Sequence, residues 1–162
     1  MLYLSGYYKL CEDVDWYPSV TGQYAIVISG TDITLDLDGH TLKQTNTAIG
    51  ECALVYIAPN SSNVLVKNGT LSQGSCAGVL ARGPASCLEV NGITTVRCSY
   101  NGPIFVAATS LGSRNNYKNA AAIFFNGGRP ANEQSSLALT TNVITNVVVR
   151  NCKTCDTGIL GY

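Results

Sequence analysis

Hydrophobic and polar residues alternate along much of the chain, and no long stretch shows the 3.6-residue spacing of an amphipathic helix. In the clearest segment, residues 32–38, Ile33, Leu35 and Leu37 alternate with three aspartates and one threonine. Five Asn-Gly or Asp-Gly pairs mark tight turns, in which the backbone favours positive φ. The alternation recurs in two pairs of valines, Val64 with Val66 and Val147 with Val149. These features predict an all-β chain.

The chain also contains an internal repeat with a period of about 25 residues. The segment 33–42 is echoed at 64–71, and weaker echoes lie at 93–98 and 147–152. A second series of apolar segments lies between them and follows the same period, as its members show: Leu54, Val79 and Ile104. A fixed period of short strands and Asn/Gly turns is typical of a β-solenoid, whereas the hairpins of a meander have no such period.

The stretches 24–30, 33–42 and 63–71 resemble right-handed parallel β-helices of the pectin-lyase-like superfold, and the resemblance covers most of residues 24–162. It implies three short parallel sheets, with Val, Ile, Leu and Cys stacked inside. At about 25 residues per turn, we expect a right-handed parallel β-helix (β-solenoid) of about five coils. This superfold includes polysaccharide lyases, glycoside hydrolases, phage tailspikes and proteins of large DNA viruses, so the resemblance alone does not select one activity.

The repeat divides the chain into parts. We expect residues 1–23, which hold five of the thirteen aromatic residues, to cap the strand edges of the first coil. Residues 24–162 are expected to form the coils, with loop insertions near 107–119 and 127–142, where polar stretches interrupt the repeat. The C-terminal end looks incomplete, because the chain stops one strand into a new coil. This end predicts a homo-oligomer, and the resemblance to tailspikes favours a trimer.

Composition excludes several classes of function. Ten basic and ten acidic side chains give a formal net charge of zero, so we expect no binding to nucleic acid or to an anionic membrane. No apolar run reaches the roughly 20 residues that a membrane span needs. Seven cysteines, an odd number, argue against a complete set of disulfides. We therefore favour buried thiols and a location in the virion or host cytoplasm over secretion.

The densest cluster of ionisable residues is Asp32, Asp36, Asp38 and His40. With Ile33, Leu35 and Leu37 inward, the three aspartates face outward, where they could bind calcium. Asp36, Asp38 and His40 could instead supply acid–base chemistry. The structural interpretation is stronger: Asp38-Gly39 is a turn, His40 is an exposed turn histidine, and Asp36 aligns with Lys67 as an ordinary cross-strand ion pair. The sequence therefore indicates no catalytic residue, no metal and no cofactor.

Two other patterns have both a functional and a structural explanation. Lys67, Arg97 and Arg150 occupy similar phases of the repeat and could form a basic stripe for an acidic polysaccharide, although a solvated, neutralised face is favoured. Cys152 and Cys155 form a lone C-x-x-C without the second pair that zinc requires, so packing is the better explanation. The Asp-Asp and Gly-His-Gly motifs of polygalacturonase-like members of the superfold do not occur.

The function that we favour is a non-catalytic structural or recognition module, of viral or virion-associated type, that binds a protein partner or a glycan. The alternative is a polysaccharide-active enzyme (lyase or glycosidase) or a fragment of one, and a third possibility is a calcium-stabilised adhesive domain. Loops on a solenoid commonly carry binding residues. The candidates in the two loop insertions are Arg114, Asn116, Tyr117, Lys118, Arg129 and Glu133.

Overall fold

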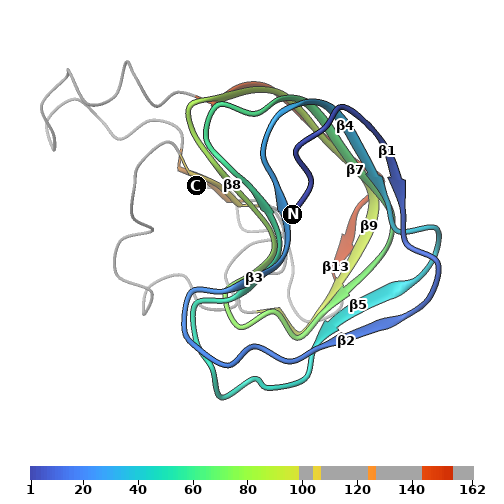
Figure 1. The fold of residues 1–162 in the computed structure, drawn as a ribbon, viewed down its shortest axis with the longest axis vertical. Helices are drawn as coiled ribbons and strands as arrows, with labels where there is room; N and C mark the ends of the chain where they lie inside the picture. Colours follow the sequence, from blue (N-terminus) through green and yellow to red (C-terminus); the bar gives the residue numbers. More distant parts are fainter. Residues whose placement is uncertain (99–103, 107–123, 127–143, 155–162) are drawn as a thin grey trace, which may run out of the picture.

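The computed structural model describes residues 1–98, 104–106, 124–126 and 144–154. In these ranges the chain consists of strands and turns, with no helix. Successive turns of the chain overlie one another around a common interior (Figure 1). The strands are β1 (Gly6–Lys9), β2 (Val14–Trp16), β3 (Tyr24–Ile28), β4 (Thr31–Asp36), β5 (Thr41–Gln44), β6 (Ala53–Ile57), β7 (Ser62–Ser72), β8 (Ala77–Arg82), β9 (Ala85–Val96), β10 (Ile104–Val106), β11 (Phe124–Asn126), β12 (Ile144–Arg150) and β13 (Lys153–Thr154).

The strands of the described ranges pair in parallel and form two sheets. The eight-stranded sheet has the order β1-β4-β7-β5-β2, with β9 on β7 and with β12 and β13 on β9. The five-stranded sheet has the order β11-β10-β8-β6-β3. Each turn of the chain therefore supplies strands to both sheets before the next turn stacks on it. This arrangement confirms an all-β parallel β-solenoid.

The expectation of three sheets is wrong for the described residues, which form two. The reason lies in β7 and β9, which run without interruption through a corner of the coil. In the first described turns, the same path is divided between separate strands, β4 and β5, and both of these pair with β7. The continuous strands thus join two of the expected sheets into one.

The core consists of inward positions that stack in the same register from turn to turn. Ile33 pairs with Val64, and Val64 pairs with Leu88. All three side chains are buried, and each such aliphatic side chain contributes roughly 1.5–3 kcal/mol when it is removed from water. Further columns are Leu35–Val66–Val90 and Ile28–Ile57–Ala81. The alternation of the sequence is thus explained by one buried and one outward residue in turn.

Two details of the predicted repeat need correction. The described structure forms about three turns, rather than the five that were expected for residues 24–162. The third echo was assigned a wrong phase, because Val64 aligns with Leu88 and not with Ile93. The echo at Val147 is confirmed, since Val147 also aligns with Leu88. The second series is displaced by one residue, because Val79 pairs with Val55 rather than with Leu54.

Residues 1–23 add strands to the end of the stack. Strand β1 pairs with β4, β2 pairs with β5, and Leu2 bridges to Ile28 of β3. Tyr8 and Trp16 pack against the core, whereas Tyr7 and Tyr17 are exposed. No described helix has the length and hydropathy of a membrane span. The six cysteines of the described ranges form no disulfide with one another.

Candidate groove on the eight-stranded sheet

The solvent-facing side of β1, β4, β7, β9 and β12, here called the outer face, carries three rows of side chains that cross the strands. The first row lies near the start of these strands and consists of Asp32, Asn63, Cys87 and Asn146. The second row is Tyr7, Thr34, Leu65, Glu89 and Val148. The third row is Lys9, Asp36, Lys67, Asn91 and Arg150. Neighbours within a row are about 4.8 Å apart, which is the spacing of paired strands.

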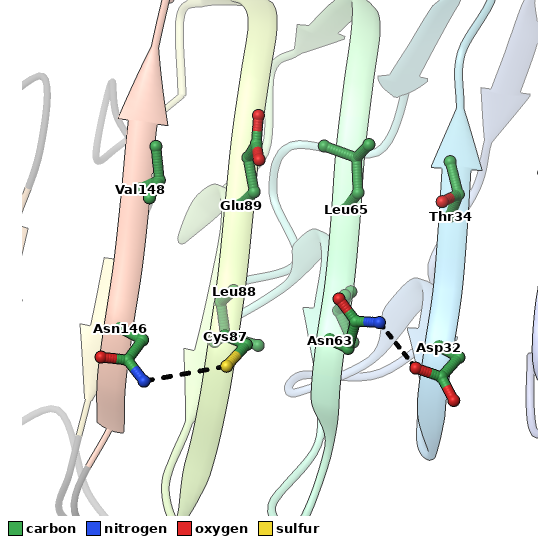
Figure 2. Close-up of a pocket in the computed structure, with 10 residues that line it drawn as sticks. Asp32, Thr34, Asn63, Leu65, Cys87, Leu88, Glu89, Asn146 and Val148 are labelled. Atoms are coloured by element: carbon green, nitrogen blue, oxygen red, sulfur yellow. Dashed lines mark hydrogen bonds between the residues drawn. The ribbon is translucent and has the colours of Figure 1, made fainter.

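A groove of about 380 Å³ lies between the first two rows. Its wall is the whole first row, and its other side is formed by Thr34, Leu65, Glu89 and Val148 (Figure 2). Val64 and Leu88 also line it. Figure 2 shows the two rows side by side on β4, β7, β9 and β12. The groove therefore combines polar side chains along one wall with a row of alternating polar and aliphatic side chains along the other.

All four residues of the first row have the left-handed backbone conformation. Their φ values are 56° at Asp32, 52° at Asn63, 53° at Cys87 and 54° at Asn146. Asn and Asp adopt this conformation more readily than other residues with a side chain, which explains why they hold three of the four positions. The repeated conformation places the four side chains in line along the groove. Such a wall follows directly from the regular stacking of the turns.

Hydrogen bonds link the first row in pairs. The amide of Asn63 donates to Oδ1 of Asp32 at 2.6 Å, and the amide of Asn146 donates to Sγ of Cys87 at 3.8 Å. The second hydrogen bond is the weaker one, because a cysteine sulfur is a weak hydrogen-bond acceptor. The carbonyl oxygens of both asparagines are acceptors in addition to these bonds. The wall therefore offers both donors and acceptors to a ligand.

The third row centres on Asp36, which is only 4% exposed. Its carboxylate accepts hydrogen bonds from the Tyr7 hydroxyl, from the backbone N–H of Asp38 at 2.8 Å and from the Asn68 amide at 3.4 Å. The Lys67 ammonium lies 3.1 Å away, which confirms the predicted cross-strand pair. Burial alone raises the pKa of Asp36, but these hydrogen bonds and the Lys67 charge outweigh it and lower the pKa to about 2.

The other candidate acid–base residues are also engaged. Asp38 forms an ion pair with Lys9 at 2.7 Å, and this partner raises the pKa of Lys9. His40 Nδ1 lies 3.3 Å from Asp13. The backbone N–H of Thr41 donates to Asp13 and, together with His40, lowers the pKa of that carboxyl group. Asp36, Asp38 and His40 thus act as attachment points between β4, β5 and the N-terminal strands.

The structure separates the three aspartates that were considered for calcium. Asp32 belongs to the first row, Asp36 to the third, and Asp38 follows in the turn. Each has its own partner, namely Asn63, Lys67 and Lys9. Within the described ranges, no group of three His, Cys, Asp or Glu residues is arranged to hold a metal ion.

The proposed basic stripe is wrong in register. Lys67 aligns with Asn91, and Asn91 aligns with Arg150, so Arg97 does not belong to the row. Arg97 follows Val96, the last residue of β9, and itself has a φ of 53°. The two stripe residues that do share the third row are neutralised, because Lys67 pairs with Asp36 and Arg150 lies 2.9 Å from Glu89. The favoured interpretation, a neutralised face, fits these contacts.

Sequence reasoning did not identify the groove. The sequence signal for the groove is an Asp or Asn directly before the aliphatic residue that recurs at one phase of the repeat, as in Asp32-Ile33, Asn63-Val64 and Asn146-Val147. Cys87-Leu88 hid the pattern, because the third repeat had been placed at Ile93. The loop candidates and Cys155 lie outside the described residues; the loop candidates are Arg114, Asn116, Tyr117, Lys118, Arg129 and Glu133.

Searches of protein-family models, of curated proteins and of solved structures find no significant match. The function is therefore argued from the outer face itself.

Proposed function

We propose that the protein is a non-catalytic structural or recognition module, and that its groove on the eight-stranded sheet binds a protein partner or a glycan. The observation that carries this proposal is the groove, with an in-line polar wall beside a row in which polar and aliphatic side chains alternate. A few polar groups that fix orientation beside apolar surface are what a binding site requires. The rigid stack of strands holds both rows in place, which reduces the entropy cost of binding.

Recognition is better supported than catalysis, because the candidate acid–base residues already have partners within the fold. Asp36, Asp38 and His40 have partners that fix them within the fold, as described above. An enzyme of the polysaccharide-active kind needs an acid and a base that are both directed at the substrate. We therefore expect no unsaturated, ultraviolet-absorbing product from pectate, alginate or hyaluronate. Product formation that Asp38→Ala abolishes would overturn the non-catalytic part of the proposal.

The binding part of the proposal is tested with the asparagines of the first row. We expect Asn63→Ala and Asn146→Ala each to weaken ligand binding by about fivefold to tenfold, because each removes a donor and an acceptor from the wall. Binding is measured by calorimetry with hits from a glycan array and a peptide array. Asn60→Ala is the matched control, since Asn60 also has a positive φ (65°) and is exposed, but does not line the groove. Equal losses in all three variants would exclude the groove.

The proposal includes a viral or virion-associated origin and assembly into a homotrimer. Both are supported by the resemblance of the repeats to the compact pectin-lyase-like β-helices of phage tailspikes and large DNA viruses. We expect light scattering to give a solution mass of three chains. A mass of one chain would reject the trimer and leave the groove as a surface of the monomer.

A further inference from the structure

The charged residues that line the groove are all acidic. Two carboxylates line it, Asp32 and Glu89, and no Lys, Arg or His is among its described lining residues. Arg150 of the third row lies 2.9 Å from Glu89 and neutralises it. A polyanion in this groove would therefore meet the negative charge of Asp32 and no cation among the described lining residues, so an acidic polysaccharide is a poor ligand.

Asp32 is the carboxylate best placed to receive a new partner. Its contact with Asn63 is a hydrogen bond from a neutral amide that uses Oδ1, so the negative charge is not cancelled and Oδ2 remains an acceptor. Its side chain is exposed and lies at the end of the first row, beside the groove (Figure 2). A cation that reached Asp32 would form a charge-assisted hydrogen bond, which is stronger than a neutral one.

The opposite wall favours a ligand with an aliphatic part. Leu65, Glu89 and Val148 are aligned on β7, β9 and β12, so an acid stands between two aliphatic side chains. Val148 is 42% exposed although it is hydrophobic, and Leu65 is partly exposed. Lysine and arginine combine an aliphatic stem with a cationic head, and they bury the stem along apolar surface while the head reaches a polar group.

We infer that the groove binds a segment of a protein partner that carries lysine or arginine beside aliphatic residues. The stem of the basic side chain lies on Leu65, and its charged head is received by Asp32. The two asparagines of the first row bind the backbone amides of the segment. This inference rests on the proposed recognition function and specifies the chemistry of its ligand.

The test is calorimetric titration of the whole protein with three peptides of the same length, in which leucine alternates with lysine, serine or aspartate. We expect the lysine peptide to bind at least about tenfold more tightly than the serine peptide, and the aspartate peptide to bind more weakly than both. High salt should reduce this preference, because the carboxylates are accessible to solvent. Equal affinity for the lysine and serine peptides would overturn the inference.

Variants locate the site. Asp32→Asn should weaken the lysine peptide about fivefold or more and leave the serine peptide unchanged, and Leu65→Ser should weaken both peptides. The controls are Asp15→Asn and Leu4→Ser, which change an exposed acid and an exposed leucine outside the groove. Losses in the controls as large as those in the groove variants would place the binding elsewhere and overturn the inference.

A neutral oligosaccharide is titrated in parallel to separate the two proposals. If it binds with sensitivity to Asn63→Ala while the lysine peptide does not bind, the basic partner is rejected and the recognition function stands. If neither peptide nor oligosaccharide binds, both proposals fail.

Discussion

Replacing Gly69 with alanine is expected to destabilise the protein by about 4 kcal/mol or more, the size of effect reserved for severe steric or core defects. A Cβ atom at this position would contact the Leu37 side chain and would lie 2.8 Å from the His40 carbonyl oxygen. That carbonyl belongs to the neighbouring turn and accepts the backbone N–H of Thr70. The clash therefore involves backbone that the strand pairing holds in place, and it cannot be relieved by a rotamer change.

Thermal unfolding followed by circular dichroism measures this effect, and the melting temperature should fall by roughly 10 °C or more. Gly22→Ala is the control, because Gly22 has a φ of +82° but no atom within 4 Å of the added Cβ. That variant should lose only about 1 kcal/mol, which is the strain of a left-handed alanine. If the two variants melt together, close packing of the turns at Gly69 is not the cause.

Asp36→Asn is expected to destabilise the protein by about 2–3 kcal/mol at neutral pH. The substitution keeps the size of the side chain but removes the charge that Lys67 and Tyr7 face. Lys67 then has no counter-ion in this network. Because Tyr7 joins β1 to β4 through this carboxylate, we also expect the N-terminal strand to detach more readily. Urea unfolding measures the loss, and Asp38→Asn, which breaks the exposed pair with Lys9, should lose far less.

The contribution of Asp36 to stability depends on pH, and its lowered pKa determines the sign of this dependence. The pKa is about 2 in the folded protein and about 3.9 in an unfolded chain, so the folded state binds this proton less tightly. The stabilisation is therefore complete above about pH 4 and is lost as the pH falls through 2. The difference in unfolding free energy between wild type and Asp36→Asn should narrow between these pH values. A constant difference would show that the charge of Asp36 is not what stabilises the fold.

The main architecture could be predicted because the alternation and the repeat both arise from one requirement, namely that the same positions of every turn face the interior. Ile33, Val64 and Val147 recur at one phase since each must face the interior at the same position of its turn. The Asp36–Lys67 pair followed from the same alignment. Phase errors arose where the pattern is ambiguous: Leu88 and Ile93 both begin an alternating segment within the long strand β9, and only the pairing with β7 distinguishes them.

Turn chemistry was predicted in kind but not in detail. The pair Asn68-Gly69 was expected to supply positive φ, and it does so at Asn68 (57°), whereas Gly69 is needed because no side chain fits there. Only the neighbouring turn reveals this second reason. The groove escaped prediction for a similar cause, because a row such as Asp32, Asn63 and Cys87 unites residues that are far apart in sequence.

The regular first row has a consequence for how the outer face can be modified. A group moved from Asn63 to Cys87, or from Cys87 to Asn146, keeps its left-handed backbone and is displaced by about one strand spacing of 4.8 Å. Exchanging residues between turns therefore shifts a chemical group along the molecule in steps of this size, while its orientation stays the same. Two labels attached at positions of the first row would report the separation of the turns directly.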